Sequence, residues 1–296
     1  MESRTASHAD KPGEPNEQIA ELPTLHEQTE AIAKELLSAY QTGQMVPIPL
    51  SAHPGFDLNM AYEVEAFLRH SREAAGHRSV GRKVGYANKA MWRVLKLETL
   101  VWAHMYEDTV HYSENNSASL ALRHPRSLKI EPEIVFGLKQ AIISKTLDAA
   151  AALESTEWLA LGFEIIDCPF PEWKFQPSDF VASFGLHAAL VIGERLQMHP
   201  EMIAPLVDQL ARFKVRMSRN GEFVEEGSGR NSLRSPALCL AELGAAIVRR
   251  FPHEPLSSGE IISSGTLTAG HPTDKGDIWR ADVEGLSLPS LTLRLT

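Results

Sequence analysis

Residues 130–138, IEPEIVFGL, alternate between two kinds of side chain with a period of two. Successive residues of a β-strand point to opposite faces, so the apolar even-numbered residues share one face, while Glu131 and Glu133 share the other. Pro132 has no amide hydrogen to donate, which predicts an edge strand or a bulge at this position. A strand of this composition is expected to be half buried within a sheet.

The two carboxylates of this segment lie about 6–7 Å apart at their Cα atoms if each strand residue rises by ~3.3 Å. Two buried carboxylates repel each other and resist joint ionisation unless a cation neutralises them. A hard divalent cation, Mg²⁺ or Mn²⁺, takes oxygen ligands of this kind. The polar, solvent-facing edge of a strand would explain Glu131 and Glu133 equally well, so both interpretations stay open at this point.

Glu164 adds a third carboxylate. It lies between Phe163 and Ile165 in the apolar segment GFEIID, where an ionisable side chain is expected to find a partner. Three carboxylates leave coordination positions open for water or for two oxygens of a substrate. A metal held in this way stabilises negative charge on the substrate, which favours the metal-site interpretation.

The sequence predicts a flexible polar tail over residues 1–22, an N-terminal helical layer over 23–78 and a β-rich domain over 79–296 that would hold the metal and any catalytic site. This order of elements predicts an α+β fold built on a mixed or rolled sheet. The predicted elements are helices over 25–42, from the N-cap Asp57 to Gly76, over 146–160 and over 235–250, strands over 80–86, 161–167 and 186–193, and a hairpin over 211–225 that turns at Asn220-Gly221.

Composition excludes several classes of protein. Hydrophobic residues make up 43% of the chain and charged residues 23%, which is ordinary globular usage. The net charge of −9 argues against sequence-independent nucleic-acid binding, which needs a basic face. No apolar stretch approaches the ~18 residues of a membrane span, and the first residues lack the apolar core of a secretory signal. Because two cysteines form neither a disulfide framework nor a zinc cluster, we expect a soluble, reduced, cytoplasmic protein without nucleic-acid or membrane partners.

Several segments together resemble one known family. They are GRKVGYANKAMW at 81–92, IEPEIVFGL at 130–138, GFEIIDCPFPEWKF at 162–175, DFVASFGLHAALVIG at 179–193, SPALCLAEL at 235–243 and SSGTLTAGHPTDKGDIW at 263–279. Over roughly residues 57–296 the chain resembles the fumarylacetoacetate hydrolase superfamily. The most similar branch holds the 2-keto-4-pentenoate and 2-oxohepta-3-ene-1,7-dioate hydratases. The resemblance implies a β-roll or barrel-like sheet of that family's C-terminal type, and assembly as a homo-oligomer.

The resemblance also implies the site. In that family an acidic triad binds Mg²⁺ or Mn²⁺, and it corresponds to Glu131, Glu133 and Glu164. A lysine beside the metal, with a depressed pKa suited to proton transfer, corresponds to Lys83. The other implied residues are Lys174 as a second catalytic lysine, and Gly265, Thr266, Asn88 and His187 as substrate-binding residues.

Simpler interpretations of these residues stay open. Lys83 could be an ordinary surface lysine, and Lys174 could be a lysine whose stem only covers apolar surface. Gly265 and Thr266 are equally compatible with an ordinary turn. His187 stands in the apolar segment SFGLHAAL, where a hydrogen-bonded histidine of the core is expected more often than a ligand.

The activity implied by the resemblance is a metal-dependent hydratase that adds water to a small 2-hydroxydienoic or 2-keto-enoic acid, as in meta-cleavage catabolism of aromatic compounds. A 2-keto diacid decarboxylase of the 4-oxalocrotonate type passes through the same dienolate and stays open. Acylpyruvate hydrolysis is disfavoured, because the hydrolase branch has a catalytic lysine where this chain has Ala182. A non-catalytic metal-binding scaffold is the fourth hypothesis, because Ala87-Asn88 and Ser183-Phe184 depart from the residues usual in the hydratase branch.

Overall fold

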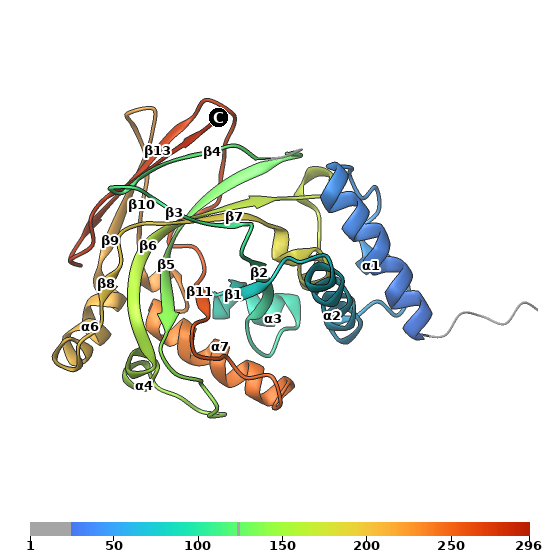
Figure 1. Ribbon diagram of the computed structural model, residues 1–296, viewed down its shortest axis with the longest axis horizontal. Coiled ribbons are helices and arrows are strands. Elements are labelled where there is room, and N and C mark those ends of the chain that lie inside the picture. The colour runs from blue at the N-terminus through green and yellow to red at the C-terminus, as the bar shows by residue number, and fades with distance from the viewer. Residues whose placement is uncertain (1–24, 123–124) are drawn as a thin grey trace, which may run out of the picture.

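The structure is a computed structural model that describes residues 25–122 and 125–296 (Figure 1). The tail predicted for residues 1–22 lies outside the described residues. Two helices at one end of the molecule, α1 (Leu25–Thr42) and α2 (Leu58–Ala74), confirm the two predicted N-terminal helices. Asp57 caps α2, as predicted, because its side chain accepts hydrogen bonds from the first free amides of the helix.

A mixed sheet, nine-stranded within the described residues, forms the centre of the molecule. Its main path runs β2-β1-β11-β5-β6-β7-β3, while β12 pairs with β5 and β8 pairs with β6. Strand β1 is parallel to β11, whereas β5 and β6 are antiparallel. The bounds are β1 Ser79–Gly85, β2 Val101–Tyr106, β3 Val110–Tyr112, β5 Leu128–Leu138, β6 Thr156–Asp167, β7 His187–Ile192, β8 Leu196–Gln197, β11 Ile261–Ser263 and β12 His271–Pro272.

This sheet curls into a roll. Its outermost strands, β2 and β3, are joined by residues 107–109 alone, so the two ends of the strand order come close together. One apolar cluster collects inward side chains from strands across the whole order, which identifies it as the filling of the roll. Its buried members are Met105, Val110, Val135, Trp158, Ala160, Leu190, Ile192 and Ile261. The predicted rolled, mixed sheet is confirmed.

Strand β5 is an interior strand, so the edge position predicted from Pro132 is wrong. The proline is tolerated because the partner strand is interrupted beside it. β11 pairs with β5 up to Val135, and β12 pairs again at Ile130. In the gap between them, the carbonyl of Pro132 accepts a hydrogen bond from the amide of Leu267 at 2.9 Å, within the loop that links β11 to β12. The missing amide hydrogen therefore falls where the sheet has no strand to accept it.

A second sheet, five-stranded within the described residues, runs β10-β9-β13-β14-β4 and packs against the roll (Figure 1). Its first two strands form the predicted hairpin, with positive φ at Asn220 (55°) and Gly221 (87°), as a tight two-residue turn requires. The bounds are β4 Ser117–Leu120, β9 Lys214–Arg219, β10 Glu222–Ser228, β13 Ile278–Glu284 and β14 Leu291–Leu295.

The helix predicted over residues 146–160 is too long. Helix α4 covers only Ala149–Glu154, capped by Asp148, and residues from Thr156 onward belong to β6. A continuous apolar run such as 158–163 fits a buried strand and a buried helix equally well in its pattern. Pairing with β5 and β7 decides for a strand. The remaining helices are α3 Lys89–Leu95, α5 Pro177–Ala182, α6 Pro200–Arg212 and the predicted α7 Pro236–Arg250, with short 3-10 turns at Leu50–Ala52, Pro171–Trp173, Phe184–Leu186 and Gly229–Asn231.

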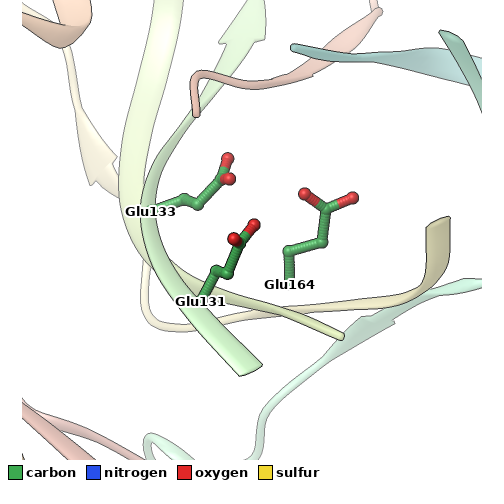
Figure 2. Close-up of side chains that lie close together, drawn as sticks. All are labelled: Glu131, Glu133 and Glu164. Atoms are coloured by element: carbon green, nitrogen blue, oxygen red, sulfur yellow. The ribbon is translucent and has the colours of Figure 1, made fainter. Parts of the chain in front are cut away.

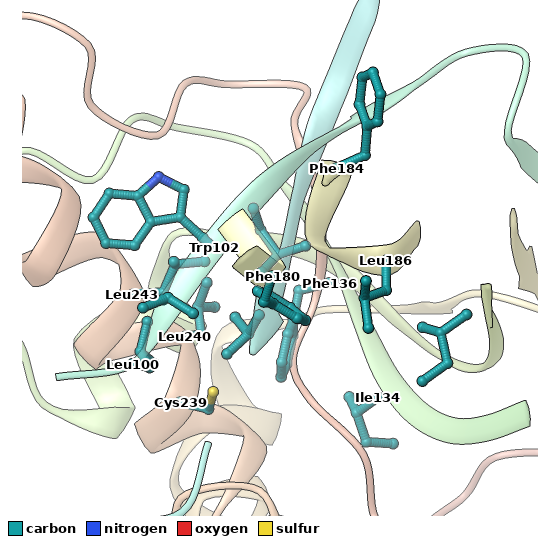
Figure 3. Close-up of a cluster of buried hydrophobic side chains, with 14 of the residues drawn as sticks. Leu100, Trp102, Ile134, Phe136, Phe180, Phe184, Leu186, Cys239, Leu240 and Leu243 are labelled. Atoms are coloured by element: carbon teal, nitrogen blue, oxygen red, sulfur yellow. The ribbon is translucent and has the colours of Figure 1, made fainter. Parts of the chain in front are cut away.

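A larger apolar core covers the outer face of the roll (Figure 3). Leu240 and Leu243 of α7 pack there with side chains such as Trp102 of β2 and Ile134 of β5. The same cluster reaches from α1 to β14, so it joins the N-terminal helices to both sheets. The boundary at residue 78 between a helical layer and a catalytic domain stays a prediction. Within the described residues, no helix is long and apolar enough to cross a membrane.

Candidate active site

Three carboxylates converge on the inner face of the roll (Figure 2). Glu131 and Glu133 come from β5, and Glu164 comes from β6, where it lies directly opposite Glu131 in the strand register. One oxygen from each lies within 4.8 Å of the others. The side chains of Glu133 and Glu164 are fully buried, and Glu131 is half-buried. The strand register thus assembles the triad that the sequence suggests.

The carboxylate of Glu133 is held on one side and free on the other. Its Oε2 accepts hydrogen bonds from the hydroxyl of Ser263 at 2.5 Å and from the amide of Gly265 at 2.8 Å. Its Oε1 is buried and has no hydrogen-bond partner among the described residues. A buried carboxylate oxygen without a donor is costly unless a cation takes that place. With two further carboxylates beside it, this oxygen fits a hard divalent metal.

The side chains of Lys83 and His187 hold the carboxylate of Glu164 in place. Lys83 Nζ lies 3.0 Å from its Oε2, and His187 Nδ1 lies 2.8 Å from its Oε1. Lys83 also donates to the carbonyl of Gly185 at 3.0 Å, and His187 Nε2 lies 3.0 Å from the hydroxyl of Thr109. These contacts fix the orientation of Glu164, as outer hydrogen bonds commonly do for metal-ligating groups.

The pKa values of the three carboxyl groups are shifted because the groups are buried and lie close to one another and to Lys83. Burial raises the pKa of Glu131 to about 7, against the opposing effect of Lys83. Burial and the neighbouring carboxylates raise the pKa of Glu133 well above its usual value. Burial alone would also raise the pKa of Glu164, but Lys83 and His187 outweigh it and hold that pKa low.

Lys83 departs from its expected pKa. Burial would lower the pKa of its ammonium, but Glu164, Glu131 and Glu133 outweigh burial and raise it. In the metal-free protein the three carboxylates therefore keep Lys83 protonated. The depressed pKa expected from the sequence is not found in this state, because no second cation shares the carboxylates with Lys83.

The raised pKa values predict that Mg²⁺ stabilises the protein more at about pH 8 than at about pH 5.5. Between its ordinary value of 4.5 and about 7, Glu131 holds more proton when folded than when unfolded. Stability therefore falls as pH rises through this window, by roughly 3 kcal/mol for this group. Mg²⁺ needs the deprotonated form, so it recovers that loss at high pH and competes with protons at low pH.

Melting temperatures with EDTA and with Mg²⁺ at both pH values measure this effect. Buried histidines also change stability in this range, because burial lowers the pKa of His104. At a given pH, their contribution is the same in the EDTA sample and in the Mg²⁺ sample, so it cancels when the two melting temperatures are subtracted. A Mg²⁺-induced rise that is equal at the two pH values, or larger at the lower one, would contradict the prediction.

A cavity of about 520 Å³ opens from the triad toward the surface. It is lined by Lys83 and Glu131 at the triad and by Gly265, Thr266 and Asn88 farther along, so five of the predicted site residues meet here. The hydroxyl of Thr266 bonds to the backbone of Thr268, and Asn88 caps α3 through the amide of Ala90. The other lining side chains include Lys129, Trp173, Phe175, Phe180 and Asn231.

Lys174 is not brought to this cavity. Its side chain is 78% exposed and forms an ion pair with Glu172 at 2.6 Å. The backbone of Glu172 and Trp173 takes positive φ angles, 55° and 57°, which turn the neighbouring side chains in opposite directions. The aromatic neighbour, Trp173, lines the cavity instead and stacks beneath Lys129, whose Nζ lies 4.0 Å from the ring centre.

His187 is buried and hydrogen-bonded, which fits the simpler interpretation of a core histidine. It contacts the triad through Glu164 but does not line the 520 Å³ cavity. It faces a separate cavity of about 680 Å³ on the other side, to which the triad contributes no lining residue among those described. The structure therefore places His187 as a support for Glu164 rather than beside a ligand in the main cavity.

Gly270 is a site residue that the sequence pattern did not single out. A Cβ at this position would lie 2.8 Å from Oε1 of Glu131. The substitution Gly270→Ala is expected to displace the Glu131 carboxylate and to lower Mg²⁺ affinity by roughly tenfold or more, as other supporting residues of metal sites do. The fold is expected to persist, because the displaced atom is the end of a flexible side chain. Calorimetric titration with Mg²⁺ measures the effect, and an unchanged affinity would contradict it.

The rolled sheet with its buried carboxylate triad, adjoining lysine and open cavity has the features of an enzyme centre suited to a divalent cation. Solved structures show the same fold. The chain superimposes on 4-oxalocrotonate decarboxylase from Pseudomonas putida G7, complexed with magnesium and adipate, with a TM-score of 0.81 at 24% identity, covering 91% of this chain and 98% of that one. Fumarylpyruvate hydrolase from Pseudomonas aeruginosa, in complex with Mn²⁺ and pyruvate, gives 0.52 at 16% identity, covering 73% and 89%. A yeast fumarylacetoacetate hydrolase family protein gives 0.50 at 13%, covering 73% and 92%.

Sequence comparison identifies enzymes whose sequences are similar to this chain. The chain is 28% identical over 262 residues to 2-hydroxyhexa-2,4-dienoate hydratase of Comamonas testosteroni, covering 88% of this chain and 96% of that protein. It is 26% identical over 263 residues to 4-oxalocrotonate decarboxylase of Pseudomonas sp. (strain CF600), covering 88% and 94%. No protein-family model matches the chain. The predicted resemblance to the hydratase branch of the fumarylacetoacetate hydrolase superfamily is confirmed by these similarities.

Proposed function

We propose that this protein is a divalent-metal-dependent hydro-lyase that adds water to a small 2-hydroxydienoic or 2-keto-enoic acid. The observation that carries the proposal is the convergence of Glu131, Glu133 and Glu164, where Oε1 of Glu133 has no hydrogen-bond partner among the described residues. Glu131 also lines a ligand-sized cavity together with Lys83. These three carboxylates would hold Mg²⁺ or Mn²⁺. When bound, such a cation supplies Lewis-acid polarisation of substrate oxygens and stabilises developing negative charge.

Each of the chain's own residues then has a defined part. Lys83 would carry the proton exchanged at the substrate, because its Nζ lies at the triad and also at the cavity wall. Gly265 and Thr266 would lie beside the substrate carboxylate, since both line the cavity. Trp173 and Phe175 would exclude bulk water from the opposite wall, which strengthens the electrostatic contacts inside. His187 would keep Glu164 oriented and would not touch the substrate.

Decarboxylation of a 2-keto diacid is the second candidate function. It would use the same carboxylate triad and the same 2-keto acid end of the substrate, and the similarity to 4-oxalocrotonate decarboxylases is nearly as high as that to the hydratases. Acylpyruvate hydrolysis is a poorer candidate, because Ala182 is fully buried in α5 and offers no proton-carrying group. A metal-binding scaffold without catalysis is the outcome expected if metal binds and no 2-keto acid reacts.

The proposal includes a cytoplasmic location and homo-oligomeric assembly, in agreement with the resemblance and with the free state of Cys168 and Cys239. Light scattering coupled to size-exclusion chromatography measures the assembly. A strictly monomeric protein at working concentration would remove that part of the proposal and leave the chemistry untouched.

An absorbance assay tests the activity. 2-Hydroxypenta-2,4-dienoate and its longer homologues absorb through their conjugated diene, so hydration removes the band. We expect a loss of absorbance that requires Mg²⁺ or Mn²⁺ and that stops on addition of EDTA. If the dienoates persist while the metal binds, the hydratase proposal fails. Release of CO₂ from 2-keto diacids then distinguishes the decarboxylase from the non-catalytic scaffold.

A further inference from the structure

A second, smaller cavity of about 180 Å³ adjoins the main one near its mouth. The two cavities share Asn88 and Asn231 among their lining residues, so a ligand in one can extend into the other. The small cavity is lined by three cationic side chains, Lys89, Arg230 and Arg234, and by no carboxylate among the described residues. We call this group of three the basic lobe.

The two arginines of the basic lobe are unpaired in an acidic protein. Within the described part of the chain, neither Arg230 nor Arg234 forms a side-chain hydrogen bond or an ion pair. Both side chains are exposed, whereas Arg126, for example, is paired with Asp167 at 2.9 Å. With a net charge of −9, the chain has carboxylates in excess, yet among the described residues none lines the small cavity. Two guanidinium groups that face a cavity without a counter-charge are suited to an anionic ligand.

The backbone that carries these arginines is strained and firmly held. Leu233 and Arg234 adopt left-handed φ angles of 47° and 71°, which are costly for residues other than glycine. The loop keeps this shape because Leu233 is buried and its amide donates to the carbonyl of Ala87 at 2.7 Å. That bond fixes the backbone of the loop beside Ala87, which lines both cavities. Strain of this kind is typical of ligand-binding loops.

The distance from the triad to the lobe fits a small molecule. One wall of the main cavity is the continuous segment 83–87, which runs from Lys83 at the triad to Ala87 at the lobe. Four residue steps span at most about 14 Å even when fully extended. A short, linear ligand chelated at the triad can therefore place its far end among the guanidinium groups.

We infer that the basic lobe binds a carboxylate at the far end of the substrate, so that the substrate class is a 2-keto or 2-hydroxydienoic diacid rather than a monoacid. This inference rests on the proposed function, because it assumes that the 2-keto acid end lies at the triad. The inference adds to the proposed function the residues that determine substrate specificity. These are Arg230 and Arg234, which would select substrates that carry a second negative charge.

Binding of two unreactive six-carbon ligands tests the inference. 2-Oxohexanoate and 2-oxoadipate have the same chain length and the same 2-keto acid end, and they differ by one terminal carboxylate. Calorimetric titration of the Mg²⁺-loaded protein is expected to give a dissociation constant at least about tenfold lower for 2-oxoadipate. In the variant Arg230→Gln/Arg234→Gln, this ratio is expected to fall toward one. Arg294→Gln, which removes an exposed arginine of β14, is the matched control and should keep the ratio.

Each of the other possible results of this experiment contradicts a specific part of the inference or of the proposed function. Equal affinity of the wild-type protein for the two acids overturns the diacid inference and leaves the proposed function standing. Failure of both acids to bind the metal-loaded protein removes the proposed function and the inference with it. A diacid preference that persists in the double variant overturns the assignment to the basic lobe. The wild-type comparison decides the substrate class even if the double variant does not fold.

Discussion

Replacing Glu133 by glutamine is expected to reduce Mg²⁺ affinity and kcat/KM by at least about 100-fold each, since a lost ligand should cost more than a lost supporting residue. The substitution removes the carboxylate whose Oε1 has no other partner among the described residues. Metal-free stability is expected to change little. The raised pKa of Glu133 favours its neutral form in the metal-free protein, and the amide resembles that form. Calorimetric Mg²⁺ titration, kinetics and melting in EDTA measure the three quantities.

Glu157→Gln is the matched control for this variant, because Glu157 is an exposed residue of β6, the strand that also carries Glu164. It is expected to keep wild-type metal affinity and kinetics. Unimpaired Mg²⁺ binding in Glu133→Gln, with the fold intact, would show that Glu133 is not a ligand. A metal-free protein that unfolds in this variant would instead assign Glu133 a structural role through Ser263 and Gly265.

Replacing Lys83 by methionine is expected to separate catalysis from metal binding. The rate constant kcat is expected to fall by about 10²–10⁴-fold, as for other positioned proton carriers. Mg²⁺ affinity is expected to be retained, because none of the proposed ligands is removed. Without metal, the buried Glu164 loses its charge partner at 3.0 Å, so the free energy of unfolding should fall by about 3–5 kcal/mol. Saturating Mg²⁺ should restore most of this loss, because the cation binds only the folded cluster.

Lys174→Met is the control, because it removes a lysine whose ion pair with Glu172 is exposed to solvent. Exposed pairs contribute at most about 1 kcal/mol, so stability and kinetics are expected to stay near the wild-type values. A large loss of activity in Lys174→Met would restore the catalytic role suggested by the sequence. Wild-type kcat in Lys83→Met would exclude Lys83 as the proton carrier.

Much of the site could be predicted because it depends on local patterns. The period-two alternation around Glu131 and Glu133 is a property of one strand, and any sheet that buries its apolar face turns both carboxylates the same way. The caps and turns at Asp57 and Asn220 are likewise local, since each satisfies its own backbone within a few residues. These elements appear in the structure where the sequence places them.

Other features follow from contacts between distant segments. Pro132 is accommodated inside the sheet only because the loop after β11 interrupts the neighbouring strand there. Lys174 is directed to solvent and Trp173 to the cavity by two left-handed residues, a turn that side-chain chemistry does not reveal. The helix expected over residues 146–160 is shortened because its apolar second half pairs as a strand between β5 and β8.

The sequence by itself determined which residue types could meet at the site: three carboxylates on apolar strands, a lysine between glycines and a glycine-rich loop near the C-terminus. The tertiary structure decided how they are charged and what they face. Strand pairing brings Lys83 against Glu164 and brings Ser263 and Gly265 against Glu133, and burial then sets their pKa values. The physical reason is that side-chain direction along a strand is a local property. Desolvation and charge pairing, in contrast, depend on segments that only folding brings together.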